Sequence, residues 1–287
     1  MIKLFHLVSL MLDHLVISSA GPNGLVQLGI LQQLVLSSLL DLSTIKCIYG
    51  SSAGSILGVL ITLDTPLQDM IDYFIQRPLG RIFQLNGTDK GLISSSCFED
   101  LLAPFFNAYD IPLTISLQEL YDRTHIDLHI FTTAVTPMSS VDLNHKSFPE
   151  VQVIQAVSMS CAIPFLFTPI LYKEEYYIDG GLVKHCPIPP VDPSRILTIL
   201  MDYKHPMNLE CPVQFLQHIM VKLFDIVTSN TKIPEGEFVY RYNSPHSALD
   251  PYVWENALTN QVFREQLIDH GKQCVQDRLN SGDKLPI

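Results

Sequence analysis

Two consecutive strand–turn–helix units near the amino terminus constrain the fold of this 287-residue chain more than any other feature. Residues 14–18 are typical of a short buried strand, and residues 25–40 carry apolar side chains at helical spacing after a glycine-rich turn. Residues 45–49 predict a second strand, with a helix over residues 55–63 behind it. Strands separated by helices pair in parallel, because each crossover returns the chain to the same end of the sheet. The sequence therefore predicts an α/β protein, a three-layer α/β/α fold with a mostly parallel central sheet.

The remaining sequence continues the same pattern without an internal repeat or a low-complexity linker. Further strands are predicted at residues 126–134, 175–178 and 196–201, and helices at residues 151–158, 213–227 and 255–279. We therefore expect a single domain over residues 1–287, in which residues 204–287 form a peripheral, mainly helical part.

Composition and charge restrict the classes of partner. Hydrophobic residues make up 47% of the chain and charged residues 16%, so it can bury a large core and keep some apolar surface for a partner or a lipid phase. A formal net charge of −11 repels nucleic-acid phosphates and anionic membranes alike. We expect no nucleic-acid partner, and mainly apolar contact with any membrane.

Three features bear on the compartment. Residues 15–40 carry no charge and are long enough to cross a bilayer, but the turn at residues 21–24 and three glutamines interrupt them. His6 and Ser9 interrupt the apolar residues 1–12, and no small-residue cleavage site follows. The six cysteines form no CxxC pair, which favours free thiols. We expect a cytoplasmic protein without a transmembrane segment, which contacts membranes only peripherally.

The motif Gly50-x-Ser52-x-Gly54 lies where the second predicted strand meets its helix. A nucleophile elbow requires this placement, because small residues let the backbone turn sharply and leave the serine hydroxyl exposed. The N–H groups of the following helix then point at the reacting centre. A plain tight turn uses the same small residues, so the motif alone leaves both interpretations open.

A glycine-rich turn, SAGPNG at residues 19–24, separates the first predicted strand from its helix. The backbone N–H groups exposed in such a turn are suited to stabilising a tetrahedral oxyanion. A phosphate-binding loop is a weaker alternative, since GxxxxGK[ST] and GxGxxG are both absent. An ordinary turn with Pro22 in the first helical turn also remains open.

Asp179 ends a predicted strand and is followed by Gly180 and Gly181. Active-site side chains gather at the carboxyl ends of parallel strands, although Asp-Gly is also a common turn. An α/β-hydrolase order of Ser, Asp and His is formally available, with histidines at positions 185, 205 and 270. That fold places more strands before its serine than the two predicted here.

In this order and spacing, the three motifs resemble those of the patatin-like phospholipases. The resemblance extends to residues 91–93 with the amphipathic helix after them, to residues 116–121, and to residues 156–164 with Phe167 and Pro169 behind them. It covers about residues 13–203, roughly two thirds of the chain, as the recognisable catalytic core. The resemblance also implies the fold predicted above.

The resemblance implies a lipid acyl hydrolase of the phospholipase A type that cleaves carboxylic esters of phospholipids or acylglycerols at a membrane or micelle surface. Ser52 would attack the carbonyl carbon, and Asp179 would accept the serine proton with no histidine between them. Backbone N–H groups of Ala20, Gly21 and Asn23 would hold the oxyanion. The other motif positions are glycines, at Gly24, Gly50, Gly54, Gly180 and Gly181. No metal or cofactor is implied.

The sequence departs from the family pattern in its oxyanion loop. The family sequence is G-G-G-x-[KR]-G, whereas two of its glycines are replaced here and the basic residue is Asn23. His185 stands where the family often has asparagine. A non-catalytic patatin-like lipid- or partner-binding protein and an acyltransferase are the alternative functions.

One alternative site remains from the residues alone. His125, Asp127 and His129 alternate along one predicted strand and could share a metal, although a polar strand face explains the same pattern.

Overall fold

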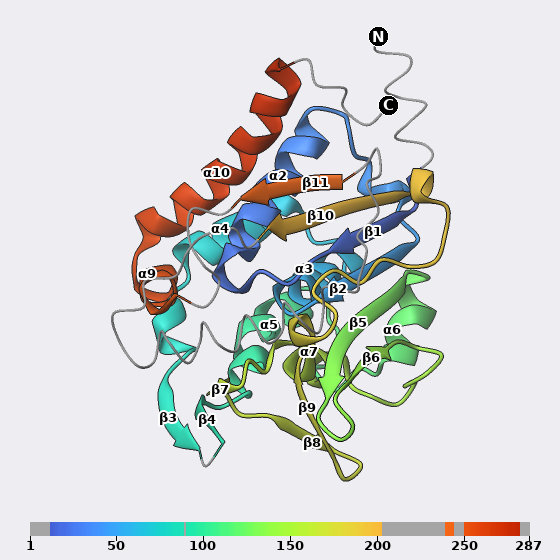
Figure 1. The fold of residues 1–287 in the computed structure, drawn as a ribbon, viewed down its shortest axis with the longest axis vertical. Helices are drawn as coiled ribbons and strands as arrows, with labels where there is room; N and C mark the ends of the chain where they lie inside the picture. The colour runs from blue at the N-terminus through green and yellow to red at the C-terminus, as the bar shows by residue number, and fades with distance from the viewer. Residues whose placement is uncertain (1–11, 89, 203–238, 244–249, 282–287) are drawn as a thin grey trace.

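The computed structural model describes residues 12–88, 90–202, 239–243 and 250–281. It confirms the α/β prediction, since helices flank a central, mostly parallel sheet (Figure 1). The helix expected at residues 213–227, the apolar residues 1–11 and His205 lie outside the described residues.

Eight strands form the central sheet in the order β11-β10-β1-β2-β5-β9-β8, with β6 paired to β5. Neighbouring strands from β11 to β5 pair in parallel, whereas β6 and β9 pair antiparallel to β5 and β8 pairs antiparallel to β9. The bounds are β1 (His14–Ile17), β2 (Cys47–Ser51), β5 (Asp127–Ala134), β6 (Ser139–Leu143), β8 (Ile170–Tyr172), β9 (Glu175–Asp179), β10 (Ile196–Asp202) and β11 (Val239–Asn243). The five strands expected from the sequence are therefore all present, as β1, β2, β5, β9 and β10.

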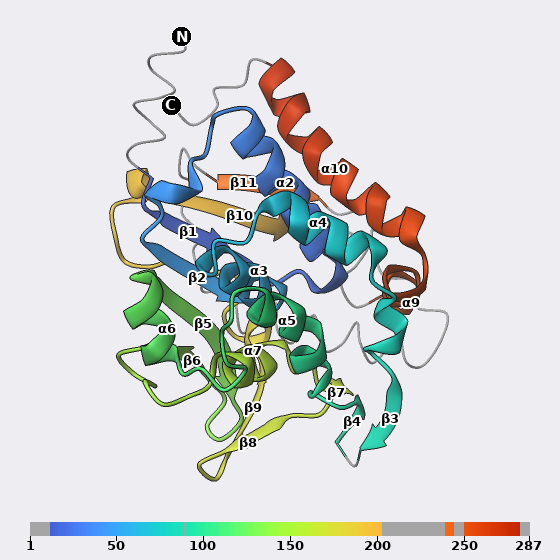
Figure 2. The same ribbon diagram turned by 180° about the vertical axis from the view of Figure 1, so that it is seen from behind.

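Helices cover one face of this sheet, behind it in Figure 1 and in front of it in Figure 2. They include α2 (Gly24–Leu36), α3 (Ala53–Thr62), α4 (Leu67–Gln76) and α10 (Gln261–Asn280). Helix α2 packs closely against α10, because a Cβ added at Gly29 or at Gly271 would lie 2.1 Å from a backbone oxygen of the other helix. The uncharged residues 15–40 thus form a strand, a turn and a buried helix, as predicted. Within the described residues, no helix combines the length and the apolar character needed to cross a membrane.

The opposite face of the sheet carries a smaller apolar cluster. The irregular segment between β9 and β10 covers Val16, Tyr49 and Leu200 there, through Cys186 and Ile188. Among the described residues, no helix contributes to this cluster. Among the described residues, this irregular segment therefore forms the layer on this face of the sheet.

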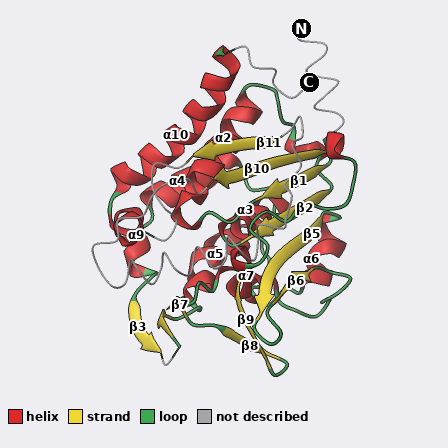
Figure 3. Cartoon of the chain, in the orientation of Figure 1, coloured by secondary structure: helices red, strands yellow, loops and turns green. Residues whose placement is uncertain are grey.

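A second, three-stranded sheet was not foreseen. It consists of β3 (Leu85–Thr88), β4 (Gly91–Ile93) and β7 (Phe165–Phe167), and it lies at the lower end of the molecule in Figure 3. Helix α5 (Cys97–Ala108) follows β4, as the resemblance suggested. The helix expected at residues 151–158 is α7 (Val153–Cys161).

The prediction of one continuous helix over residues 255–279 is wrong. The chain forms α9 (Pro251–Thr259) and then α10, with Asn260 extended between them at φ −114° and ψ 107°. The Asn260 side chain accepts a hydrogen bond from the Phe263 N–H and so caps the start of α10. Apolar side chains continue at helical spacing across the break, and spacing alone therefore did not reveal it.

Candidate active site

Ser52 occupies a sharp turn between β2 and α3. Its φ of 52° and ψ of −124° are a backbone conformation that costs on the order of 1–3 kcal/mol for a residue other than glycine. The two motif glycines permit this turn, since a Cβ at Gly50 would lie 2.5 Å from the Gly54 carbonyl oxygen and a Cβ at Gly54 would lie 2.2 Å from that of Ile17. The small residues therefore build a strained strand-to-helix elbow rather than an ordinary reverse turn.

Hydrogen bonds from neighbouring elements hold this elbow in place. The Ser52 N–H donates to Ser160 Oγ at 2.9 Å, and the Ser160 hydroxyl donates to the Phe131 carbonyl at 2.6 Å. The Ser55 hydroxyl donates to the Ser52 carbonyl at 2.7 Å. Ser160 lies on α7, and its role was missed at the level of sequence, where it appeared only as part of the segment 156–164.

Asp179 ends β9 and is brought to Ser52 by strand pairing, because β9 lies beside β5 and β5 lies beside β2. The Asp179 N–H donates to the Ala162 carbonyl and the Thr133 hydroxyl donates to the Asp179 carbonyl, both at 2.9 Å. One carboxyl oxygen, Oδ1, accepts a hydrogen bond from the Gly181 N–H at 2.7 Å. The carboxyl group is therefore held in a fixed position although it ends a strand.

The Asp179 carboxyl is buried, with 4% of the residue exposed. Burial raises the pKa of Asp179 to about 7, against the opposing effects of the Ser52 side chain and the Gly181 N–H. Its second oxygen, Oδ2, is buried and has no partner at hydrogen-bonding geometry among the described residues. The Ser52 hydroxyl thus lies near enough to influence the carboxyl, but the contact is looser than a full hydrogen bond. Catalytic contacts are often long in ligand-free proteins.

The turn after β1 presents backbone donors beside the elbow. Gly21 has a φ of 53°, which favours glycine, whereas Ala20 has a φ of −153° and a ψ of −11°. Within the described residues, the N–H groups of Ala20 and Gly21 have no hydrogen-bond partner. The Asn23 N–H instead donates to the Ala20 carbonyl at 3.1 Å. Of the three donors expected from the resemblance, two have no partner among the described residues, and the third donates within the turn.

The remaining motif glycines lie around the same centre. Gly180 and Gly181 begin a short 3-10 turn directly behind Asp179. Gly24 begins α2, where a Cβ would lie 3.0 Å from that of Ala53. The structure therefore brings every residue of the three predicted motifs to one end of the sheet.

A cavity of about 110 Å³ opens beside Ser52. Its other walls are almost entirely apolar and come from α2, α3, α4, α5, β7 and α9. Aromatic side chains form part of these walls: Phe74, Phe83, Phe98, Phe167 and Trp254. An apolar cavity that ends at a serine hydroxyl suits a hydrocarbon chain carrying a reactive group at its end.

Comparison of the sequence with known protein families shows to which family the chain belongs. The family model described as patatin-like phospholipase matches residues 15–192, which include the elbow, the glycine-rich turn and Asp179. The chain belongs to the patatin-like phospholipase family. The departures of its glycine-rich turn from the family sequence are therefore variations within this family.

Individual relatives are distant. The chain is 25% identical over 181 residues to the probable lipid hydrolase 463L of Invertebrate iridescent virus 6, a match that covers 61% of each chain. It is 27% identical over 198 residues to the uncharacterized protein R571 of Acanthamoeba polyphaga mimivirus, which covers 66% of this chain and 64% of that protein. This chain thus spans less than two thirds of the length of these relatives.

Among solved structures, VipD from Legionella pneumophila shares the fold. The TM-score is 0.57 at 15% identity, and the match covers 90% of this chain and 67% of VipD. At this identity, the likeness concerns the fold alone.

His185, which stands where the family often has asparagine, is tied to the glycine-rich turn. Its Nδ1 lies 2.5 Å from Ser19 Oγ, and its Nε2 lies 2.9 Å from the Met201 carbonyl oxygen. A carbonyl only accepts, so Nε2 carries the proton and Nδ1 accepts from the Ser19 hydroxyl. The Ser19 N–H also donates to the His185 carbonyl at 2.9 Å. Ser19 directly precedes the two free N–H groups, so this histidine fixes their position.

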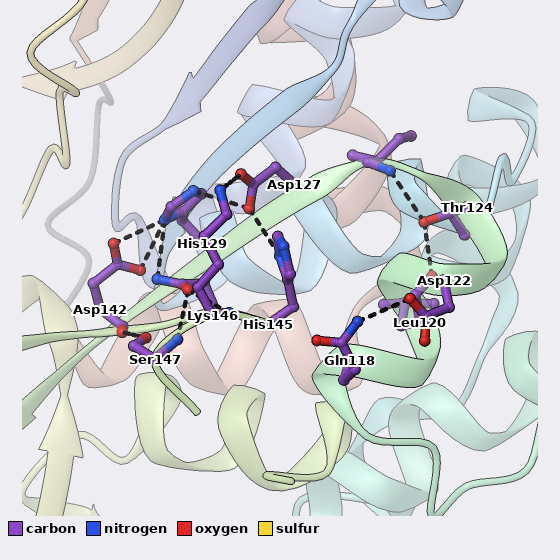
Figure 4. A network of polar contacts seen from close by, with 12 residues as sticks. Gln118, Leu120, Asp122, Thr124, Asp127, His129, Asp142, His145, Lys146 and Ser147 are labelled. Atoms are coloured by element: carbon purple, nitrogen blue, oxygen red, sulfur yellow. Dashed lines mark hydrogen bonds and ion pairs between the residues drawn. The ribbon is translucent and has the colours of Figure 1, made fainter. Parts of the chain in front are cut away.

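A second polar cluster surrounds His129 on β5 (Figure 4). His129 lies between two carboxylates, with Nδ1 2.8 Å from Asp142 and Nε2 3.2 Å from Asp127. Burial alone would lower the pKa of His129, but the two carboxylates outweigh it and raise the pKa to about 9. Lys146 Nζ lies 2.7 Å from Asp127.

The metal alternative for this region does not fit the side chains. Asp127 and His129 bind each other, and His125 instead ends α6 (Leu117–Thr124) in a left-handed conformation. No group of three or more potential metal ligands occurs among the described residues. The cluster therefore works as a network of ion pairs.

Proposed function

We propose that the protein is a lipid acyl hydrolase that cleaves carboxylic esters of glycerophospholipids or acylglycerols through Ser52 and Asp179. One observation carries this proposal: a strained serine lines an apolar cavity and lies beside a buried carboxyl of raised pKa, and the preceding turn has two backbone N–H groups without a partner among the described residues. Membership of the patatin-like phospholipase family and similarity to a probable lipid hydrolase support it.

Acylation begins with the substrate acyl chain in the apolar cavity and its ester carbonyl at Ser52. As Ser52 Oγ forms a bond to the carbonyl carbon, its proton passes to Asp179 Oδ2, the buried oxygen without a hydrogen-bond partner among the described residues. The carbonyl oxygen becomes an oxyanion and accepts hydrogen bonds from the N–H groups of Ala20 and Gly21. The bond to the alcohol oxygen then breaks, and that oxygen takes the proton from Asp179.

Deacylation repeats the sequence with water as nucleophile. Asp179 accepts a proton from the water as its oxygen attacks the acyl-enzyme carbonyl, and the same two N–H groups hold the second oxyanion. The bond to Ser52 Oγ breaks, Ser52 recovers its proton, and a free fatty acid leaves. A pKa of about 7 suits both directions of proton transfer at neutral pH.

A panel of p-nitrophenyl esters and phospholipids, assayed with wild type and with Ser52→Ala, tests this function. We expect release of fatty acid from glycerophospholipid by the wild type alone. Transfer of the acyl group to added alcohols in preference to water would instead assign an acyltransferase. Lipid binding without turnover in both proteins would assign a non-catalytic role.

Filling the cavity should change the preference for acyl-chain length. Ala257 on α9 lines the cavity and is buried, so Ala257→Leu places a larger side chain where the acyl chain lies. We expect kcat/KM for a palmitoyl ester to fall by about tenfold and that for a butyryl ester to change by less than about twofold. Ala103→Leu on α5, outside this cavity, is the matched control. Equal losses for both esters would contradict the assignment of the cavity.

Removing the hydroxyl that links the turn to His185 should slow the chemical step. We expect Ser19→Ala to lower kcat by about tenfold with little change in KM, because the Ala20 and Gly21 donors lose a support without losing contact with bound lipid. His185→Asn offers Ser19 another partner and should retain kcat within about threefold. A rise in KM at constant kcat would show that the pair acts in substrate binding.

A further inference from the structure

Exposed apolar side chains gather at one end of the molecule. Leu85, Leu92 and Phe165 lie on the small sheet and Leu171 lies on β8, and between 55% and 77% of each residue is exposed. The small sheet and β8 lie at the lower end in both Figure 1 and Figure 2. We call these four residues the apolar end. Monomeric proteins rarely leave such side chains together in water unless they meet a partner or a membrane.

The backbone and the local charge support this interpretation. Phe165 has a φ of 69°, a genuine outlier for a bulky residue, and its side chain is 69% exposed although aromatic rings are normally buried. Residues 162–172 contain no charged residue, in a chain whose acidic residues outnumber its basic ones by 29 to 18. Strain and lack of charge thus coincide where the chain presents its apolar side chains.

The apolar end is continuous with the cavity beside Ser52. Strand β7 carries the exposed Phe165 at its start and Phe167 at its end, and Phe167 is 1% exposed and lines the cavity. Phe83, which lines the same cavity, lies just before β3. Strand β7 therefore joins the apolar end to the wall of the cavity.

The charge of the protein indicates whether this surface suits a neutral or an anionic membrane. A net charge of −11 disfavours attraction to anionic lipids. Near the apolar end, Lys90 Nζ lies 5.4 Å from the centre of the Tyr176 ring and Lys173 Nζ lies 5.1 Å from that of the Tyr172 ring. Lys173 is also paired with Glu150 at 2.6 Å, which neutralises its charge locally. Tyrosines and lysines are typical of side chains that lie at the level of lipid headgroups.

We propose that the apolar end docks on the surface of a neutral phosphatidylcholine bilayer and inserts Leu85, Leu92, Phe165 and Leu171 among the upper parts of its lipids. This inference rests on the proposed function, which supplies the reason for docking on a membrane. Membrane binding can nevertheless be measured separately from hydrolysis. It places the small sheet, whose Phe167 lines the cavity, against the membrane that holds the substrate.

Flotation with phosphatidylcholine vesicles tests the docking, with Ser52→Ala as the parent protein so that the vesicles remain intact. The test variant adds Leu92→Thr, Phe165→Asn and Leu171→Thr, because threonine suits strands and asparagine tolerates a positive φ. We expect vesicle affinity to fall at least about 100-fold, since burial of each side chain contributes roughly tenfold or more. Leu36→Gln, which removes an exposed leucine at the end of α2, should bind like the parent.

Several outcomes would overturn the docking surface. These are unchanged vesicle binding by the triple variant, stronger binding to phosphatidylserine vesicles than to phosphatidylcholine vesicles, or a dimer that only the triple variant disrupts. With Ser52 restored, the triple variant should hydrolyse a soluble butyryl ester within about twofold of wild type and lose activity on vesicles. Failure of the wild type to hydrolyse the soluble ester would count against the proposed function and leave the docking result standing.

Discussion

Ser52→Ala is expected to lower kcat for every ester substrate by at least about 10⁴-fold, because the proposed mechanism forms the acyl-enzyme on the Ser52 hydroxyl. The oxyanion donors and the cavity remain, so the variant should still bind lipid. Steady-state hydrolysis of p-nitrophenyl butyrate and of phosphatidylcholine measures the loss. Thermal unfolding should be nearly unchanged, because alanine keeps the backbone conformation of the elbow and Ser52 Oγ makes no hydrogen bond at full geometry among the described residues.

Ser51→Ala is the matched control for this experiment. Ser51 is the preceding residue, and its hydroxyl is buried without a hydrogen-bond partner among the described residues. Removal of this hydroxyl should leave kcat within a few-fold of the wild-type value. It should also stabilise the fold slightly, because an unsatisfied buried hydroxyl is lost. If Ser51→Ala were inactive and Ser52→Ala active, the assignment of the nucleophile would be wrong.

Asp179→Asn is expected to lower kcat/KM by about 10³-fold or more, since an amide cannot accept the serine proton. The proposed mechanism requires the carboxylate form, and burial raises the pKa of Asp179 to about 7. Its kcat/KM should therefore rise with pH and level off above about 7. The residual activity of the variant should lack this rise. A wild-type profile that is flat from pH 5 to pH 9 would contradict Asp179 as the base.

The same substitution should stabilise the protein in alkaline solution. The pKa of Asp179 is raised from 3.8 to about 7, so its contribution to stability is complete below pH 3.8 and is lost as the pH rises through 7. At pH 8, removal of the buried charge is expected to increase the free energy of unfolding by up to about 4 kcal/mol. Urea unfolding of both proteins at pH 5 and pH 8 measures this difference.

Asp127→Asn provides a control of opposite sign. Burial would raise the pKa of Asp127, but His129 and Lys146 outweigh it and hold this pKa below its usual range. Because this pKa is lowered on folding, Asp127 stabilises the fold at pH values above the pKa that it has in the unfolded chain. This stabilisation is lost as the pH falls through the pKa of the folded protein. Asp127→Asn should therefore destabilise the protein at pH 8 while hydrolysis continues. Destabilisation by both substitutions at pH 8 would show that Asp179 is stabilised as a carboxylate.

Short-range patterns made part of the structure predictable from the sequence. Ser52 was expected between a strand and a helix because Gly50 and Gly54 flank it within five residues, and their close backbone contacts explain why small residues are needed. Asp179 was expected at a strand end because a predicted strand precedes it and two glycines follow it directly. The five predicted strands have strong apolar runs and are all present.

Features that depend on distant contacts were not predictable in this way. Ser160 fixes the elbow from 108 residues away, and His185 supports Ser19 from 166 residues away. The Asn23 N–H is occupied by a turn whose shape no residue pattern specified. The break at Asn260 depends on a single side-chain cap within a continuous apolar pattern. In each case, the decisive partner is chosen by the fold rather than by sequence neighbours.

Reaction with a fluorophosphonate, followed by peptide mapping by mass spectrometry, shows whether Ser52 is the nucleophile beside the Asp179 carboxyl. We expect a single adduct on Ser52, formed faster as the pH rises through about 7 in the wild type and greatly slowed in Asp179→Asn. An adduct on another serine, or full hydrolytic activity without any adduct, would contradict this assignment.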